Sequence, residues 1–350
     1  MPKVCAVTTA VPPHKITQAQ AQEFARAVFG ARIPNFDGTL QTFQNSGIET
    51  RYFSMPVEWF AKQHSFPEKN EAYLASAVEL SGRAASDLLR EARVEPSEID
   101  YVIYVNTTGL ATPSIDAHLI NLLGLRPDVR RTPIWGLGCA GGAAGLSQAY
   151  HYALGHPDEL VLVVAAELCG LTFMRDDYSK SNLVATALFG EGAAAVLIAG
   201  DENKADGLPV IATQSRFFPH SLDVMGWNVV SEGLQVVFAK RIPDIINQSA
   251  KDDFAHFLSK YNLTLDDISA FLFHPGGRKV LEAYQTTLGL SDDRMALSRD
   301  ILRDYGNMSS VTVLFVLKRY LEQFGVGRGG YGLISALGPG FCSESLLIEL

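Results

Sequence analysis

Three residues of this 350-residue chain carry side chains suited to acyl transfer. Cys139 lies in the run GLGCAGGAAG, His274 in FHPGG and Asn307 in YGNMSS. A thiol can attack a thioester and hold its acyl group, whereas an imidazole N–H and a carboxamide NH₂ can both donate to one developing oxyanion. This set suits an enolate formed by decarboxylation, because loss of CO₂ then replaces proton abstraction by a strong base.

The local sequence around each residue allows a site, and each residue also has a simpler structural explanation. We expect a helix over 140–155 that begins at Cys139, where unpaired backbone N–H groups favour a thiolate and the glycines leave room for an acyl chain. His274 ends a strand, and ligand sites of α/β folds gather at such carboxyl ends. The structural alternatives are a small buried thiol, a strand-capping histidine and, for Asn307, a helix N-cap.

The elements that must position these residues occur twice along the chain. Residues 98–106 (EIDYVIYVN) and 267–274 (DISAFLFH) are both typical of buried strands. Each is followed by a helix-like stretch ending in Leu-Gly-Leu and a loop, then by an apolar helix and a second strand, at 140–155 and 160–165 in one unit and at 308–323 and 331–336 in the other. Cys139 and Asn307 therefore occupy equivalent places.

Two similar α/β halves would explain this repetition, although unrelated strand–helix–strand units also resemble one another. The polar stretch Gly200–Leu208 is typical of a linker, so we expect one half over 1–205, carrying the cysteine, and another over 206–350, carrying the histidine and asparagine. If a pseudo-twofold axis relates the halves, equivalent points meet near it. Cys139, His274 and Asn307 are then neighbours in space.

The composition narrows the class of protein further. Hydrophobic residues make up 47% of the chain, charged residues 19%, and the net charge is −9, which argues against general nucleic-acid binding. No apolar run is long enough to span a bilayer, and the start of the chain lacks a signal-peptide pattern, so we expect a cytoplasmic protein without stable membrane insertion. The other cysteines show no metal-binding spacing and are interpreted as buried thiols: Cys5, Cys169 and Cys342.

Five motifs, in this order along the chain, carry a family resemblance. They are GLGCAGGAAGL, TALFGEGAAAVLI, FHPGGRKVLE, DYGNMSSVTVLFVL and ALGPGF. Together they resemble the type III polyketide synthases, the chalcone-synthase-like branch of the thiolase fold. The form of the first motif is similar to that of bacterial synthases that make alkylpyrones or alkylresorcinols.

The resemblance implies a five-layer αβαβα fold and a homodimer. It implies that Cys139 accepts the acyl group and that His274 and Asn307 form the pair for decarboxylation and oxyanion stabilisation. The substrates are then acyl-CoA and malonyl-CoA, with no further cofactor. Phe189 matches the aromatic gatekeeper between the CoA tunnel and the cavity.

The resemblance also implies which residues contact the substrates. Arg278 and Lys279 are the candidates for the CoA phosphates because they follow the His274 turn, where the mouth of the tunnel is expected. The basic group that plant enzymes carry in the region of Arg51 is otherwise missing here. Thr112 stands where those enzymes place a dimer-bridging methionine, and Val236 stands where they place a second aromatic residue. The remaining substrate contacts implied are Cys169, Thr172, Thr108, Gly276, Gly277, Leu337, Gly338 and Pro339. Smaller cavity residues favour a long acyl starter.

The function that follows is iterative decarboxylative condensation of malonyl-CoA onto an acyl group, expected to be a fatty acyl group, that is held on Cys139. Ring closure would then give an alkylpyrone or a related phenolic product. Three alternatives stay open: a single condensation of the β-ketoacyl-ACP synthase III type, whose usual His-Gln-Ala-Asn motif is missing; a non-condensing acyl-CoA-binding protein of the thiolase fold; and a Cys–His–Asn thioester hydrolase.

Overall fold

The computed structural model describes residues 1–33 and 36–350. Its strands are β1 (Lys3–Ala10), β2 (His14–Thr17), β3 (Thr50–Phe53), β4 (Ile99–Asn106), β5 (Arg130–Trp135), β6 (Leu160–Leu168), β7 (Glu191–Ala199), β8 (Leu208–Phe217), β9 (Met225–Val230), β10 (Gly233–Phe238), β11 (Ile268–Phe273), β12 (Tyr331–Gly338) and β13 (Cys342–Glu349). Its helices are α1 (Gln18–Phe29), α2 (Phe36–Thr39), α3 (Gln41–Gln44), α4 (Val57–Phe60), α5 (Phe66–Ala92), α6 (Ile115–Leu123), α7 (Gly141–Gly155), α8 (Lys180–Leu188), α9 (Ile242–Ser259), α10 (Arg278–Leu288), α11 (Ala296–Tyr305) and α12 (Thr312–Phe324).

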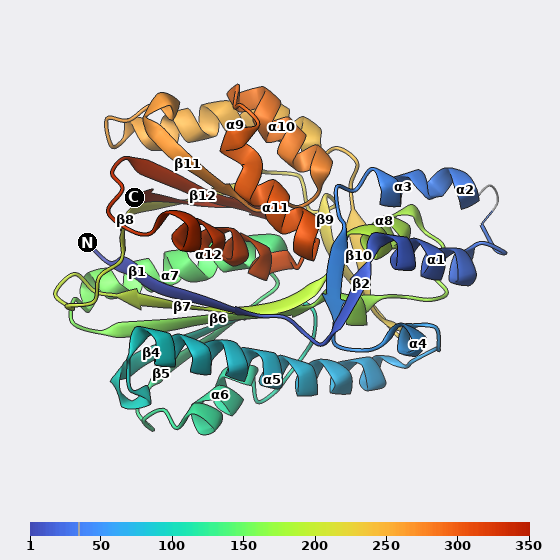
Figure 1. The fold of residues 1–350 in the computed structure, drawn as a ribbon, viewed down its shortest axis with the longest axis horizontal. Coiled ribbons are helices and arrows are strands. Elements are labelled where there is room, and N and C mark those ends of the chain that lie inside the picture. The colour runs from blue at the N-terminus through green and yellow to red at the C-terminus, as the bar shows by residue number, and fades with distance from the viewer. Residues whose placement is uncertain (34–35) are drawn as a thin grey trace.

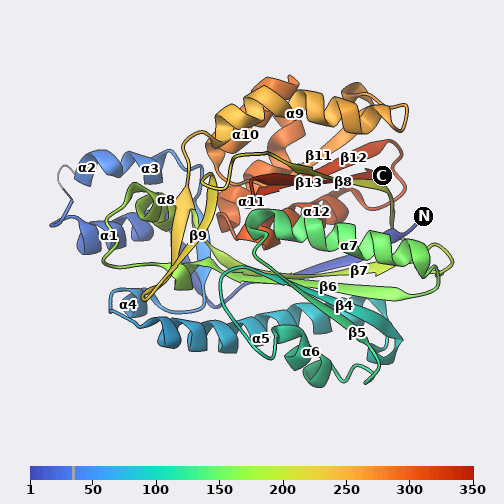
Figure 2. The same ribbon diagram turned by 180° about the vertical axis from the view of Figure 1, so that it is seen from behind.

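Two sheets and three helical layers are stacked on one another (Figure 1). The hydrogen-bonded order of the main strands is β11-β12-β13-β8-β1-β7-β6-β4-β5, but β1 and β8 share only two residue pairs, so the sheet divides there into two. Helices α7 and α12 lie between the sheets, α9 and α10 cover one outer face, and α5 and α6 cover the other, as the view from behind also shows (Figure 2). This confirms the predicted five-layer αβαβα thiolase fold.

The central layer is apolar because its helices must bury both faces. Helix α12 presents Val313, Leu314, Val316 and Leu317 to a core that also contains residues of β6, β7, β12 and β13. Strands β6 and β7, which pack against this core, are buried along their whole length, as expected for strands covered on both faces. This packing fixes the ends of the strands and helices where the candidate residues lie.

The pairing of the strands is the same in both sheets. Strand β4 runs parallel to β6, and β6–β7 and β7–β1 are antiparallel. Likewise β11 runs parallel to β12, and β12–β13 and β13–β8 are antiparallel. The predicted duplication is therefore present in the topology, and the chain crosses from one sheet to the other between β7 and β8.

The two repeats differ at one point that the sequence did not reveal. Between the paired helices we expected a loop in both units, but the first contains strand β5 and the second contains helix α11. Strand β5 forms the outer edge of its sheet and pairs only with β4 among the described residues. The second sheet therefore lacks a counterpart of β5, and α11 leads directly to Asn307.

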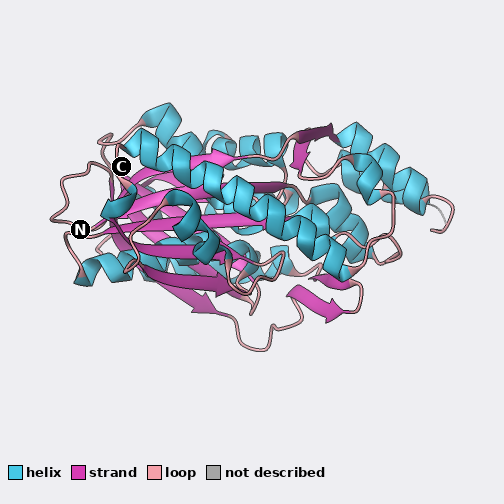
Figure 3. Ribbon diagram, turned by 90° about the horizontal axis from the view of Figure 1, so that it is seen from below, coloured by secondary structure: helices cyan, strands magenta, loops and turns pink. Residues whose placement is uncertain are grey.

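A smaller group of elements lies at one end of the layers and provides the walls of a pocket. It contains α1 to α4, α8 and the strand pairs β2–β3 and β9–β10 (Figures 1 and 3). Helix α1 begins at a capping box in which Thr17 and Gln20 satisfy each other's backbone N–H groups. Within residues 1–33 and 36–350, no helix has both the length and the apolar character needed to cross a membrane.

Candidate active site

Cys139 lies in a tight turn at the base of α7. The turn, Gly138–Ala140, is a single 3₁₀ turn that continues directly into the helix, and the thiol is only 5% exposed. Gly138 has φ +48°, a conformation that glycine adopts without steric cost. A Cβ at Gly338 would lie 2.3 Å from the carbonyl oxygen of Leu137, so the end of β12 packs directly on this turn.

Asn307 is held between the two halves by its backbone and its side chain. Its N–H donates to the carbonyl of Leu188 and its carbonyl accepts from Gly190 N–H, at 2.8 and 2.9 Å. Its Oδ1 accepts from Ser309 N–H at 2.8 Å, and its Nδ2 donates to the carbonyl of Gly276 at 3.0 Å. The second N–H of the carboxamide is left for another acceptor.

His274 follows the end of β11, where its backbone N–H donates to the carbonyl of Ser335 at 2.8 Å. The side chain is 4% exposed, and neither ring nitrogen has a hydrogen-bond partner in the described part of the chain. Burial lowers the pKa of His274 to about 3, so the imidazole is neutral near pH 7. A neutral, unpartnered imidazole is available to donate one N–H to a substrate oxygen.

The structure brings these three residues together across the two halves. The Cys139 thiol lies 3.9 Å from Asn307 Oδ1. The backbone of Gly276, which accepts from Asn307, lies next to the imidazole, since a Cβ on this glycine would be 3.6 Å from His274 Nε2. One thiol and two neutral hydrogen-bond donors thus surround one small region.

The protonation of the thiol differs from the expectation. Burial raises the pKa of the Cys139 thiol to about 12, with a smaller rise caused by the nearby carboxyl of Glu167, while hydrogen bonds from Ser309 and Asn307 lower it. The expected stabilisation of a thiolate by the helix start is therefore wrong for this buried side chain. In this structure burial thus favours the thiol over the thiolate.

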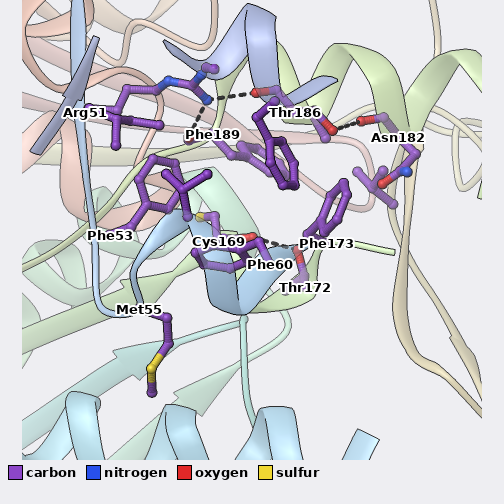
Figure 4. Close-up of a pocket in the computed structure, with 17 residues that line it drawn as sticks. Arg51, Phe53, Met55, Phe60, Cys169, Thr172, Phe173, Asn182, Thr186 and Phe189 are labelled. Atoms are coloured by element: carbon purple, nitrogen blue, oxygen red, sulfur yellow. Dashed lines mark hydrogen bonds between the residues drawn. The ribbon is translucent and has the colours of Figure 1, made fainter. Parts of the chain in front are cut away.

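An apolar pocket of about 630 Å³, including the part open to solvent, lies beside Cys169 and Phe189. Figure 4 shows the rings of Phe53, Phe173 and Phe189 around the space next to Cys169. Its other lining residues are Ile16, Ala21, Phe24, Arg51, Met55, Val57, Phe60, Gly170, Thr172, Asn182, Ala185, Thr186 and Val236. The predicted cavity residues Phe189, Cys169 and Thr172 thus share one wall of a largely hydrocarbon-lined space.

Phe189 connects this pocket to Asn307. It directly follows α8, pairs with Asn307 in an isolated parallel bridge, and lies 5.5 Å from the ring of Phe238 and 6.2 Å from that of Trp227. Val236 lines the same region, while Phe238 supplies an aromatic ring nearby. The ring of Phe238 therefore partly replaces the aromatic side chain expected at position 236.

Arg51 has a structural role rather than one at the surface. It is 1% exposed, and its guanidinium donates to the carbonyls of Thr186 and Phe189 and to Gln18 Oε1, at 2.7 to 2.9 Å. Burial lowers its pKa to about 9. Carbonyls at the C-terminal end of α8 partly compensate the positive charge, as expected for a cation at a helix C-terminus. Its position excludes the surface contact with CoA considered from the sequence.

The remaining predicted residues fall into three groups. Leu337 and Gly338 end β12 and Pro339 follows it; Gly338 and Pro339 pack on the cysteine turn, Gly276 lies next to the His274 ring, Gly277 lies near Leu188, and Thr108 is buried. Arg278 and Lys279 are exposed at the start of α10, where Arg278 pairs with Glu282 at 2.7 Å. Thr112 is exposed in the loop after β4 and does not line the pocket of its own chain, so its contact with the substrate stays a prediction.

Two buried carboxyl groups were missed by the sequence analysis. Glu167 and Glu191 are fully buried, and burial raises the pKa of each to about 7. Both lie within otherwise apolar strand sequences, LVLVVAAEL and EGAAAVLIA. An acidic residue in such a run is a usable signal, because carboxylates are rarely buried without hydrogen-bond partners.

A fold of this class with a thiol, an imidazole and a carboxamide at one point is typical of condensing enzymes. The model of the N-terminal domain of chalcone and stilbene synthases matches residues 2–202, and that of the C-terminal domain matches residues 209–350. The chain is 42% identical to a putative chalcone synthase of Bacillus subtilis (strain 168), covering 99% of this chain and 98% of that protein. It is 38% identical to 1,3,6,8-tetrahydroxynaphthalene synthase of Streptomyces peucetius subsp. caesius, covering 99% and 92%.

A solved structure shows the same similarity in three dimensions. The 1,3,6,8-tetrahydroxynaphthalene synthase of Streptomyces coelicolor A3(2), a bacterial type III polyketide synthase, superposes with a TM-score of 0.94 at 28% identity, covering 99% of each chain. The chain belongs to the chalcone and stilbene synthase family, the type III polyketide synthases. It is thus an acyltransferase that uses malonyl-CoA.

Proposed function

We propose that this polyketide synthase extends a long-chain acyl starter held on Cys139 with several malonyl units and closes the product to an alkylpyrone or a related phenol. The observation that carries the proposal is the meeting of one thiol and two neutral donors, Cys139, His274 and Asn307, next to Phe189, which pairs with Asn307 and lines an apolar pocket. Each part of this arrangement corresponds to one step of the chemistry.

In the first step the Cys139 sulfur attacks the thioester carbonyl of the acyl-CoA. The bond from the carbonyl carbon to the CoA sulfur breaks, and the proton of the thiol leaves with CoA as its free thiol. The reaction exchanges one thioester for another, so it needs no energy source. Because the thiol is protonated beforehand, deprotonation accompanies attack rather than preceding it.

In the second step malonyl-CoA places its thioester oxygen between His274 and Asn307. The bond to the carboxylate breaks, CO₂ leaves, and the electron pair becomes an enolate whose oxygen accepts from both donors. Loss of one well-placed donor of this kind costs about 100- to 1000-fold in rate. The enolate carbon then attacks the Cys139 thioester and releases the sulfur, and no metal or redox cofactor is required for any of these steps.

The apolar pocket supports a long aliphatic starter. An aliphatic tail that enters between Cys169 and Phe189 would contact mainly hydrocarbon and aromatic side chains. Burying apolar surface in this way stabilises the complex by about 25 cal/mol per Å². The Streptomyces relatives named above are tetrahydroxynaphthalene synthases, so an aromatic product without an aliphatic tail is the competing outcome.

The homodimer and the contacts to CoA belong to the same proposal. Strand β5 forms the open edge of its sheet. Two large apolar residues are exposed there: Trp135 at the end of β5 is 46% exposed, and Leu110, two residues before Thr112, is 42% exposed. A second copy covering this edge would bring Thr112 toward the partner's cavity. Arg278 and Lys279, exposed next to the His274 loop, are suited to the phosphates of CoA.

Incubation of the purified protein with malonyl-CoA and acyl-CoAs of graded length, with products identified by mass, tests the proposal. We expect products that contain the acyl chain and lose one CO₂ per malonyl unit. Products made from malonyl-CoA alone would contradict the long starter, and free acid released without CO₂ would identify a hydrolase. Light scattering of the same preparation tests the dimer.

Three alanine variants separate the assigned roles. We expect Cys139→Ala to lose acylation, with Cys5→Ala as the control because that thiol lies in β1, outside the site. We expect His274→Ala and Asn307→Ala to suppress CO₂ release from malonyl-CoA while Cys139 still becomes acylated. Normal CO₂ release in both variants would show that other groups stabilise the enolate.

A further inference from the structure

Glu167 is a fully buried carboxyl group for which the proposed steps give no role. It lies at the carboxyl end of β6, is inaccessible to solvent, and accepts hydrogen bonds from three different residues. Its nearness raises the pKa of the Cys139 thiol, so it opposes formation of the thiolate. Its hydrogen bonds indicate a different role for this carboxyl group, which is to hold the chain around Cys139.

One oxygen of Glu167 supports the chain on the N-terminal side of the nucleophile. Its Oε2 accepts from the backbone N–H of Thr107 at 3.0 Å and from the hydroxyl of Thr108 at 2.8 Å. The hydroxyl of Thr107 in turn accepts from the backbone N–H of Gly138 at 3.0 Å. Glu167 is therefore linked through Thr107 to the residue immediately before Cys139.

The other oxygen supports the chain on the C-terminal side and reaches the other half of the molecule. Its Oε1 accepts from the hydroxyl of Ser310 at 2.7 Å. Ser310 packs directly against the start of α7: a Cβ at Gly142 would lie 2.1 Å from the Ser310 carbonyl oxygen, and one at Gly141 would lie 3.2 Å from Ser310 Cβ. The same turn begins three residues earlier with Asn307.

We infer that Glu167 is a positioning residue that sets the location of the Cys139 sulfur relative to the His274–Asn307 pair. The inference rests on the proposed function and adds a requirement to its condensation step. The pair itself is fixed by other bonds, from His274 to Ser335 and from Asn307 to Gly276. Glu167 instead joins both flanks of the cysteine turn to the turn that carries Asn307.

This arrangement predicts that two activities of the enzyme separate when Glu167 is changed. Decarboxylation of malonyl-CoA requires the donor pair, whereas carbon–carbon bond formation also requires the thioester to lie within reach of the enolate. A displacement of about 1 Å can reduce such a step about 100-fold. Without the link, enolate still forms but is protonated to acetyl-CoA more often than it is condensed.

The test compares Glu167→Gln and Ser310→Ala with the unmodified protein. Malonyl-CoA is supplied with an acyl-CoA starter, and CO₂, acetyl-CoA and condensation products are quantified together. We expect condensation to fall about 10- to 100-fold in both variants while CO₂ release stays close to the unmodified rate. Glu191→Gln is the matched control, since this equally buried glutamate bonds to Ser54 instead, and its ratio of products should not change.

Two further readouts make the outcome decisive. We expect iodoacetamide to alkylate Cys139 faster in Ser310→Ala, because the turn is less restrained, and this measurement needs no turnover. Equal losses of CO₂ release and condensation, or no loss of either, would overturn the role assigned to Glu167. Absence of CO₂ release by the unmodified protein would instead contradict the proposed function. If Glu167→Gln does not fold, Ser310→Ala, which loses one hydroxyl, still decides the matter.

Discussion

Replacing Glu191 with glutamine should make the stability of the protein less dependent on pH. Glu191 is the first residue of β7, is fully buried, and accepts from the backbone N–H of Ser54 at 2.6 Å. Burial raises its pKa from the ordinary value of 4.5 to about 7, although hydrogen bonds from Ser54, Gly170 and Leu171 lower it in part. The folded chain therefore holds this proton at pH values where the unfolded chain has released it.

The sign and size of the effect follow from this difference. Below pH 4.5 both states are protonated, so Glu191 has no effect on the pH dependence. Between 4.5 and 7 only the unfolded state loses its proton, which lowers the free energy of the unfolded state relative to the folded state. The free energy of unfolding therefore falls as the pH rises through this interval. The full loss is about 3 kcal/mol, because each pH unit between the two pKa values corresponds to about 1.4 kcal/mol.

Urea denaturation at several pH values from 5 to 8, at one protein concentration, measures the effect. The free energy of unfolding of Glu191→Gln minus that of the unmodified protein should increase by about 2–3 kcal/mol toward high pH. Using the difference removes the contributions of groups common to both proteins, and Glu202→Gln at the surface serves as the control. A difference that is constant with pH would refute the reasoning.

Three further predictions concern the pocket and the site. Ala185→Phe fills the pocket beside Phe189, so kcat/KM for long acyl-CoAs should fall about tenfold or more relative to short ones, measured by competition between starters. Gly338→Ala places a Cβ against the cysteine turn and should destabilise the fold by about 1–3 kcal/mol in urea titrations, whereas Gly155→Ala, with no atom within 4 Å, should not destabilise it. The ring resonances of His274 should not change between pH 5 and 8, and a midpoint near 6.5 in NMR titration would contradict its lowered pKa.

The sequence was sufficient to predict two similar α/β halves because their patterns repeat, whereas the five-layer arrangement was implied by the family resemblance. Buried strands at 98–106 and 267–274, each followed by a similar series of helices, predicted two halves and the meeting of Cys139 with Asn307. The pattern of apolar and polar residues can be read from a single sequence, because each strand and helix must present its apolar residues to the neighbouring layer. The general position of the site follows from the same repetition.

Properties that depend on burial could not be predicted in this way. The pKa of the Cys139 thiol is decided by the loops packed over it, which come from residues far along the chain, such as Pro339 and Ser310. Neighbouring glycines and the helix start are visible in the sequence, but the extent of desolvation is not. The pocket could not be predicted for the same reason, because its walls combine residues that are far apart in the sequence, from 16–60, from 169–189 and Val236.

The two similar halves differ in the segment before each turn, which is strand β5 in the first half and helix α11 in the second. In the first half, the segment before the cysteine turn is strand β5, which extends its sheet and forms its outer edge. In the second half the equivalent segment is a helix that ends at Tyr305, so Gly306 and Asn307 leave it toward the other half. Glu167 then joins the two turns through Ser310. The repeated topology thus brings the turns together, while the differences in sequence place a thiol on one turn and a carboxamide on the other.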